Sequence, residues 1–259
     1  MTIVAALIDQ THALANDQPG PVTNLLTSRP RLPEWTLYVA VAFGAFSGAA
    51  FAARRGFDLV GVLGLATAQG IGGLLLMGIL LQQGVPSVLE TNWYLIIVAG
   101  AALVAFFLAD LIIQAMESLL ILDALSLGLL CAWGTNQALR ADLEDVAAIF
   151  IGVITAVGGG ILRDILSGRA PDVLRPGILT ATAALIGAIV FVLMVDFTPA
   201  TRPFAQTATV AVVATIRLLS HWLRWETRGA RDYSERLMRH RHPGNYDPPS
   251  KPNDSDAKQ

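Results

Sequence analysis

A few glycine and charged residues stand inside otherwise apolar stretches, and their spacing indicates the passage of an ion or small solute. Residues 158–166 read GGGILRDIL, so three glycines precede Arg163 and Asp164 by less than one helical turn. Each glycine is about 1 kcal/mol less favourable than alanine in a helix interior, so this run is expected to loosen or bend a helix. Backbone carbonyls released there would need water, an ion or another helix as partner.

A second glycine group, within residues 67–73, has the same character. Hydroxyl or amide oxygens precede each group and are suited to replacing a cation's hydration shell, although a polar contact in the core is an equal alternative. Close packing between helices is the alternative for the glycines, but the charges that follow the triple favour a pathway. The candidate path residues are Thr67, Gln69, Gly70, Gly72, Gly73, Thr155, Gly158, Gly159, Gly160, Arg163 and Asp164.

Charged side chains inside apolar segments must face a cavity or one another, because a charge facing lipid costs several kcal/mol. We expect Arg163 to line the path as a gate, while the alternative is that Arg163 reaches the membrane surface. Arg217 needs an acidic or carbonyl partner, and either a structural tie or a place in the pore wall would satisfy it. Asp123 could cap a helix N-terminus or pair with Arg217, and the same alternatives are open for Asp110.

The composition requires a membrane to surround these residues. Of the 259 residues 54% are hydrophobic and only 15% charged, whereas soluble domains carry about 25% charged residues. Residues 59–139 contain no lysine or arginine. The sequence has no nucleophile–base pair, zinc spacing or nucleotide loop, so neither an enzyme nor a cofactor or metal site is predicted. It also has no basic stripe for nucleic acid.

The sequence predicts an all-α polytopic membrane protein with seven membrane-spanning helices, each near the roughly 20 apolar residues that a bilayer requires. Basic residues concentrate on the side of the C-terminus, which predicts a cytoplasmic C-terminus and an N-terminus outside. The expected spans are Trp35–Ala53, Leu59–Gln82, Trp93–Gln114, Leu119–Leu139, Val146–Leu166, Ile178–Val195 and Phe204–Leu223.

The first three spans and the next three look like copies of one unit. At an offset of 86 residues, Gly48 matches Gly134 and Arg54 matches Arg140; with one extra residue, Gly72-Gly73 then matches Gly159-Gly160. Because three is odd, the second copy enters the membrane inverted, and inverted repeats place their functional centre near the midplane. We therefore divide the chain into an extension (1–33), two repeats (34–114 and 115–202), a seventh span (203–223) and a basic, then disordered, tail (224–259).

The motifs AFGAFSGAAFAARRGFDLVGVLGLATAQGIGG, LDALSLGLLCAWGTNQAL and VGGGILRDILSGRAPDVL, with the late Arg217, resemble bacterial relatives of the trimeric intracellular cation (TRIC) channels, also labelled glycine-transporter-domain proteins. The resemblance runs from Trp35 to Trp225. It implies a homotrimer in the bacterial inner membrane, with a potassium-conducting pore in each protomer between glycine-bent spans two and five. The glycine triple and its following arginine carry over onto Gly158–Gly160 and Arg163.

The first repeat departs from the family pattern. Ile71 stands where the family has a glycine, and Leu76-Met77 stand where it has Arg-Asp, so this half of the path is expected to be drier. The expected function is a monovalent cation channel, and the alternative is a carrier for glycine or a similar small amino acid, whose carboxylate and amine would meet broken helix ends. The Arg224–Arg241 stretch is expected to contact anionic lipid.

Overall fold

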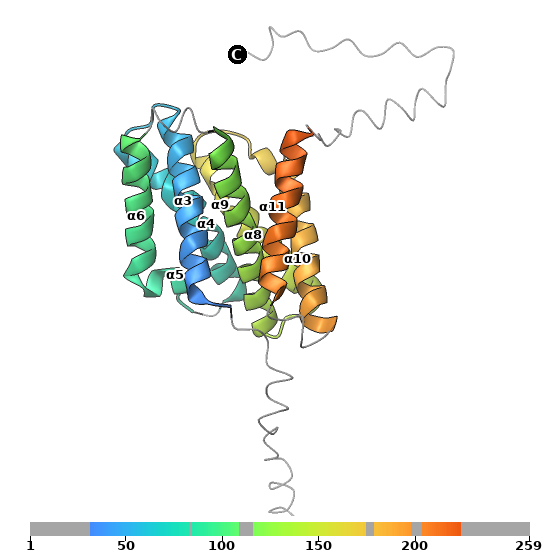
Figure 1. The fold of residues 1–259 in the computed structure, drawn as a ribbon. Coiled ribbons are helices and arrows are strands. Elements are labelled where there is room, and N and C mark those ends of the chain that lie inside the picture. Colours follow the sequence, from blue (N-terminus) through green and yellow to red (C-terminus); the bar gives the residue numbers. More distant parts are fainter. Residues whose placement is uncertain (1–31, 83, 109–115, 175–178, 198–203, 224–259) are drawn as a thin grey trace, which may run out of the picture.

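In the computed structural model, residues 32–82, 84–108, 116–174, 179–197 and 204–223 are described, and all regular elements within these ranges are helical. The all-α prediction is therefore confirmed. The order is α3 (Glu34–Ala53), α4 (Leu59–Leu81), a short α5 (Ser87–Glu90), α6 (Asn92–Phe107), α8 (Met116–Arg140), α9 (Asp145–Leu166), a 3-10 turn η1 (Asp172–Leu174), α10 (Thr180–Phe197) and α11 (Ala205–Trp222) (Figure 1).

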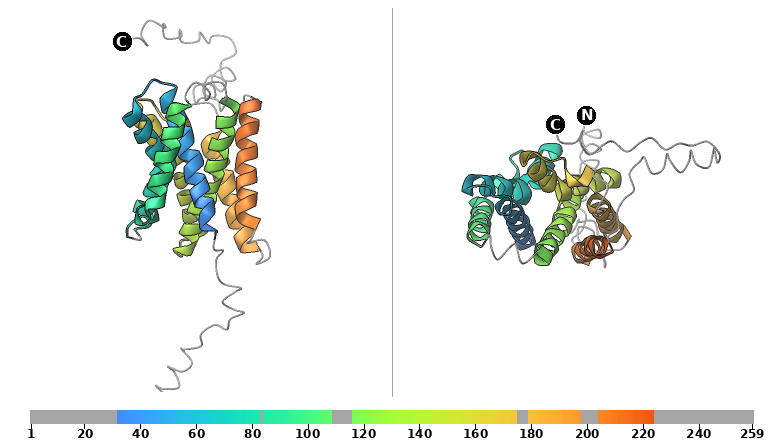
Figure 2. Two further views of the ribbon diagram at one scale, coloured as in Figure 1. Left: turned by 60° about the vertical axis from the view of Figure 1, so that its left-hand side comes forward. Right: turned by 90° about the horizontal axis from the view of Figure 1, so that it is seen from above.

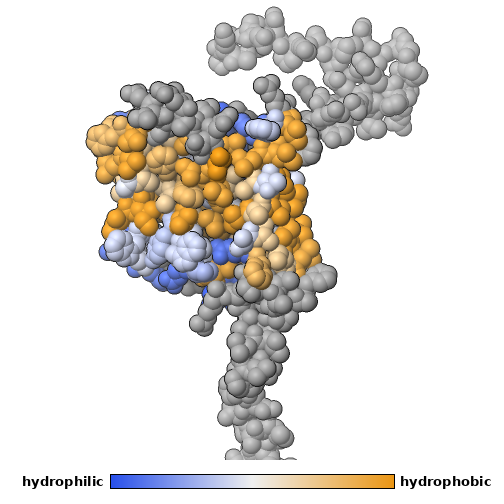
Figure 3. Space-filling view, viewed as in Figure 1, coloured by the Kyte–Doolittle hydropathy of each residue, from blue (hydrophilic) through white to orange (hydrophobic). Residues whose placement is uncertain are grey.

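Four segments are long and apolar enough to cross a bilayer by length and composition: Glu34–Ala53, Leu59–Leu81, Leu119–Arg140 and Asp145–Leu166. The helices over Asn92–Phe107 and Thr180–Asp196 are shorter and apolar. Large side chains such as Val60, Phe107 and Val146 are 75–79% exposed on the outside of the bundle, and much of the helical surface visible in Figure 3 is apolar. An exposed apolar surface of this kind is compatible with a surrounding of lipid. The count of seven spans stays a prediction.

The bundle consists of two helix triplets and one additional helix. Helices α3, α4 and α6 contact one another, as do α8, α9 and α10; α4 meets α9 and α3 meets α8 across the centre, and α11 packs on α8 and α10 (Figure 2). In Figure 1, α3 begins at the lower end of the bundle and α8 at the upper end, so the two triplets run in opposite directions. We call the end where α3, α9 and α11 finish the upper end.

The connections between helices use residues suited to tight turns. The carboxylate of Asp58 accepts a hydrogen bond from the Gly61 amide at 2.8 Å and caps the start of α4. Gly56, with a φ of 73°, turns the chain between α3 and α4, and Gln82 ends α4 in the left-handed region. The turn at Gly56 keeps α3 and α4 side by side, and α4 also packs against α9.

Candidate functional site

Both glycine groups lie within uninterrupted helix. Helix α4 continues through Gly70–Gly73, and α9 continues through Gly158–Gly160. Neither helix is therefore interrupted at its glycines, and the predicted bending stays a prediction. The missing side chains permit a close approach between α4 and α9 instead, which is the packing alternative weighed for these residues.

The approach is so close that only glycine fits. A Cβ atom on Gly73 would stand 2.0 Å from the carbonyl oxygen of Thr155, and one on Gly159 would stand 2.3 Å from the carbonyl oxygen of Gln69. Both obstacles are backbone atoms, so no change of side-chain rotamer would make room. We call this contact the glycine crossing.

The contacts at the glycine crossing are reciprocal. A Cβ on Gly72 would lie 2.7 Å from Leu162, and a Cβ on Gly158 would lie 2.7 Å from Leu76. Gly72 and Gly158 are 86 residues apart, and so are Leu76 and Leu162. The contact of Gly73 with Thr155 and that of Gly159 with Gln69 are related by the same offset. Two copies related by a local two-fold axis produce this pattern.

Reciprocity also corrects the alignment of the repeats. Because Gly72 and Gly73 take the places of Gly158 and Gly159, the offset stays at 86 and no extra residue is needed. Leu74, rather than Ile71, then occupies the place of the third glycine. Met77 and Gly78, rather than Leu76 and Met77, occupy the places of Arg163 and Asp164.

The remaining glycine and hydroxyl candidates are engaged in packing or within their own helices. A Cβ on Gly70 would stand 2.9 Å from the Cβ of Ala45, so Gly70 serves the contact between α4 and α3. The Thr67 hydroxyl donates to the Leu63 carbonyl at 2.8 Å. The fully buried Thr155 hydroxyl donates to the Ile151 carbonyl at 2.7 Å. Neither hydroxyl group directs its proton toward the crossing.

Gln69 belongs to a polar cluster beside the glycine crossing, which we call the polar junction: Ser47, Gln69, Asp123, Thr180 and Arg217. One oxygen of Asp123, Oδ1, accepts hydrogen bonds from the Gln69 amide nitrogen at 2.9 Å and from the Ser47 hydroxyl at 3.3 Å. The other, Oδ2, pairs with the Arg217 guanidinium, which also donates to the Thr180 hydroxyl. The polar junction therefore joins α3, α4, α8, α10 and α11.

This arrangement decides between two roles for Asp123. Helix α8 begins at Met116, so Asp123 is inside the helix and caps nothing. Its side chain is 15% exposed and that of Arg217 is 12% exposed. This largely buried ion pair ties α11 to the first and second repeats. Asp110 lies outside the described residues.

Arg163 and Asp164 form a second charged cluster, at the upper end of the bundle. Both Nε and Nη2 of Arg163 donate to Oδ1 of Asp164, at 2.8 and 2.6 Å, and Oδ2 of Asp164 accepts the backbone N–H of Asp172 at 3.0 Å. Asp164 is only 2% exposed. The pair therefore faces the protein, which agrees with the cost of exposing charge to lipid.

Three guanidinium groups surround one aromatic ring at this end. The Cζ atoms of Arg55, Arg163 and Arg169 lie 4.1, 4.4 and 6.0 Å from the centroid of the Phe51 ring. Burial and the nearby charges of Arg169 and Arg163 lower the pKa of Arg55. We call Phe51, Arg163 and Asp164 the upper mouth. Three guanidinium charges at this end stand against the two carboxylates of Asp164 and Asp172, an excess of positive charge that disfavours cations unless the arginines move.

The lower end has a hollow where the upper end has charged side chains. This hollow, the lower cavity, has a volume of about 160 Å³, and its lining includes Leu74, Met77, Gly78, Pro86, Glu90 and Gln137. At the repeat offset, Met77 and Gly78 correspond to Arg163 and Asp164, and Gln137 corresponds to Phe51. Sequence reasoning missed Glu90, Gln137 and Phe51; carrying the repeat offset through to residues 51 and 137 would have found the last two.

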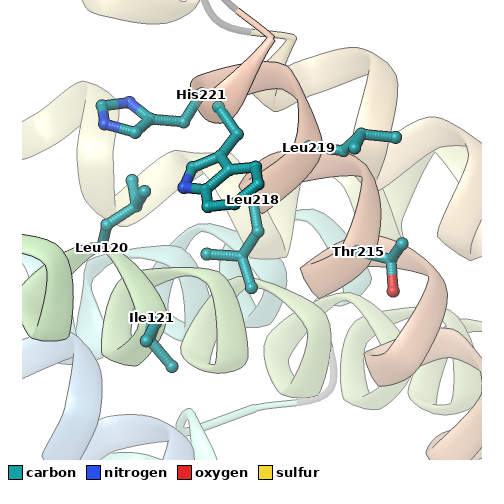
Figure 4. A pocket seen from close by; sticks show the side chains of 7 residues that line it. Leu120, Ile121, Thr215, Leu218, Leu219 and His221 are labelled. Carbon is teal, nitrogen blue, oxygen red and sulfur yellow. The ribbon is translucent and has the colours of Figure 1, made fainter.

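A larger hollow of about 420 Å³ lies elsewhere, between α8 and α11 (Figure 4). Its walls are mostly apolar, from residues such as Leu120, Ile121 and Leu218, and its polar groups are those of Thr215, His221 and the Trp222 indole. No residue of the glycine crossing lines it. An ion would gain little from these walls, so we place the candidate path at the crossing.

The repeat is also visible in comparison with known proteins. The family model described as "Glycine transporter" matches the chain twice, at residues 34–110 and 120–196. The chain belongs to this glycine-transporter family. The two matches start 86 residues apart and coincide with the helix triplets α3–α4–α6 and α8–α9–α10.

Individual members of the family are similar over nearly their whole length. A UPF0126 membrane protein of Deinococcus radiodurans is 33% identical over 198 residues, which cover 75% of this chain and 91% of the relative. A structure described as a TRIC cation channel is 30% identical, with a TM-score of 0.70, over 77% of this chain and 97% of its own. The TRIC orthologue from Rhodobacter sphaeroides is 33% identical, with a TM-score of 0.67, over 72% and 95%.

Proposed function

We propose that the protein is a channel that conducts monovalent cations, potassium foremost, along the glycine crossing of each protomer. The observation that carries the proposal is the position of the crossing, on the local two-fold axis between the lower cavity and the upper mouth. The similarity to solved structures described as TRIC cation channels supports the same function. The all-helical fold and apolar surface support a non-enzymatic membrane role.

The proposed route runs from the lower cavity, between Leu76 and Leu162, to the upper mouth. At the crossing the two backbones touch, so this conformation is closed. Leu76 and Leu162 are apolar and offer an ion no replacement for water, which makes them a hydrophobic constriction. Opening would require α4 and α9 to slide or separate there, which lifts Leu162 from Gly72 and Leu76 from Gly158.

Arg163 provides the second barrier. Its guanidinium lies against Phe51 at the end of the route, and Asp164 holds it there through two hydrogen bonds. A positive charge at this position repels permeating cations, so its removal should increase the current. We propose that movement of Arg163 away from Phe51 opens the upper mouth.

The test is potassium current through protein reconstituted into planar bilayers. Wild-type protein is expected to conduct potassium, and Arg163→Ala is expected to raise the current several-fold because the barrier charge is lost. Arg140→Ala is the matched control: this exposed arginine ends α8 at the lower end, and its loss should leave the current unchanged. Silent bilayers with inserted protein, or equal effects of both variants, would refute the proposal.

Orientation, assembly and location are further parts of the proposal. We propose that the upper end faces the cytoplasm and that the N-terminal side lies outside; the gathering of Arg55, Arg163 and Arg169 at the upper end supports this orientation. The solved orthologue is described as trimeric, and we propose a homotrimer in the bacterial inner membrane. We propose residues 34–114 and 115–202 as the repeats, and anionic lipid as the partner of Arg224–Arg241, which lies outside the described residues.

A glycine carrier is the second candidate, favoured by the lower cavity. Its volume suits a small amino acid, and Glu90 could attract an ammonium group. Saturable uptake of labelled glycine into proteoliposomes, without potassium current in the same preparation, would support the carrier. Potassium current with linear, non-saturating glycine flux would support the channel.

A further inference from the structure

We propose that the polar junction is a binding site for a monovalent cation, and that the guanidinium of Arg217 fills this site in the present structure. The ligand class is an alkali cation, held by side-chain oxygens. The inference rests on the proposed function only because it takes the bound cation to be the one that the channel conducts. Its test measures binding and not conduction, so an absence of current in bilayers would contradict the proposed function and not this inference.

The anionic centre of the site is Asp123. Its carboxylate stands within α8, beside membrane helices α4 and α11, where an uncompensated charge is strongly disfavoured. The donors that reach Oδ1 from Ser47 and Gln69 are neutral. Among the described residues, the ion pair of Asp123 is made with Arg217. The carboxylate therefore depends on one tethered cation for neutralisation.

An unused oxygen adjoins this centre. Gln69 is 8% exposed, and while its amide nitrogen binds Asp123, its oxygen Oε1 is buried without a hydrogen-bond partner. A Cβ on Gly160 would stand 3.9 Å from Oε1, so α9 presents a glycine without a side chain to this oxygen. Buried polar groups normally have partners. The orphaned oxygen, on the amide that already binds Asp123, is therefore an available ligand for a cation beside that carboxylate.

Arg217 fits the site only in part. Two of its nitrogens bind Asp123 and Thr180, but its Nε is buried without a partner. A spherical cation could instead be coordinated by Asp123, the Gln69 oxygen and the Ser47 hydroxyl oxygen, the kind of ligands that replace a hydration shell. One carboxylate neutralises one positive charge, so a cation beside Oδ1 and the Arg217 guanidinium on Oδ2 compete for Asp123. Cation binding and the docking of Arg217 therefore exclude each other.

This exclusion connects the seventh helix to the occupancy of the site. Arg217 belongs to α11, which lies outside both family-model matches. Displacement of Arg217 would expose Asp123 to a cation, and a bound cation would weaken the attachment of α11 to α8. By linkage, each event favours the other.

The experiment compares thermal unfolding of the purified full chain in potassium chloride and in choline chloride at equal ionic strength. Arg217→Gln removes the tethered cation, so about 0.3 M potassium should raise its melting temperature by at least about 3 °C relative to choline. Wild-type protein should melt at one temperature in both salts, because Arg217 already fills the site.

The double variant Asp123→Asn/Arg217→Gln is the matched control. It carries neither charge, and it should fold and melt without dependence on potassium. Equal melting of Arg217→Gln in both salts would overturn the proposal, as would a double variant that responds to potassium equally. The proposal would also be overturned if the double variant folded while Arg217→Gln stayed unfolded in every salt. That result would show that potassium cannot replace the guanidinium as the partner of Asp123. Failure of both to fold contradicts it too, since the neutral pair is expected to fold.

Discussion

The two ends of the glycine crossing have equivalent backbones and opposite contents. At the upper mouth, Arg163 and Asp164 form an ion pair beside Phe51, with Asp164 nearly inaccessible. At the lower end, Met77, Gly78 and Gln137 occupy the corresponding positions and leave a cavity of about 160 Å³.

The repeat forms a symmetric backbone framework, and a few side chains make its two ends chemically different. Glycines at matched positions hold the two helices together identically, whereas the charged pair exists on one side only. In the proposed channel an ion would enter the lower cavity with little electrostatic resistance, and the positive upper mouth would decide whether it leaves. A channel that responds differently to the two sides of the membrane requires such asymmetry.

The glycine crossing itself offers the largest expected effect. Gly73→Ala and Gly159→Ala each place a methyl group within 2.0–2.3 Å of a carbonyl oxygen on the opposite helix, so each should destabilise the fold by about 2–4 kcal/mol. Gly64→Ala is the control, because nothing lies within 4 Å of the added carbon. Thermal unfolding in detergent measures the stability of all three variants. Unequal losses of stability for Gly73→Ala and Gly159→Ala would show that the two contacts are not equivalent.

Transplanting the charged pair should produce the next largest effect. The double variant Met77→Arg/Gly78→Asp gives the lower cavity the residues of the upper mouth, and potassium current should fall about tenfold, equivalent to about 1.4 kcal/mol of added barrier. Gln82→Arg places the same charge at the exposed end of α4 and should change the current little. A current unaffected by the double variant would show that ions do not pass the lower cavity.

The two leucines beside the glycines should behave alike. Leu76→Ser and Leu162→Ser each make the constriction more polar, and each is expected to raise potassium current about threefold by easing its hydration. Leu80→Ser, on the exposed side of α4, is the control. If only one of the two leucine variants responded, the constriction would lie off the two-fold axis.

The smallest effect is expected from the helix hydroxyls. Thr67→Val and Thr155→Val remove groups that donate to carbonyls in their own helices, so potassium current should change less than about twofold, under about 0.4 kcal/mol. A selectivity change between potassium and sodium in either variant would instead show a hydroxyl facing the ion.

Several features of the fold could be predicted from the sequence because lipid imposes strict conditions on it. Apolar length and charge distribution identified the helical segments, and the repeat of Gly48 at Gly134 identified the duplicated unit. The effect of the glycines was not predictable, because a run such as Gly158–Gly160 permits both bending and close packing. The difference depends on whether another backbone lies opposite, which only the tertiary arrangement decides.

The charged residues illustrate the same limit. The need of Arg217 for a buried partner followed from the cost of burying charge, and Asp123 was one of its candidates. The choice between capping and pairing depended on where α8 begins, seven residues before Asp123. Gln137 and Phe51 carried no chemical signal of their own, and their importance appears only when the two ends of the crossing are compared.

The central claim, that cations pass between Leu76 and Leu162, is tested most directly by cysteine modification during recording. In Leu162→Cys protein, a positively charged thiol reagent should attach in the route and abolish most of the potassium current, while Leu80→Cys protein keeps its current. The native Cys131 is fully buried and should not react. Current that persists after mass spectrometry shows complete modification of residue 162 would contradict the account.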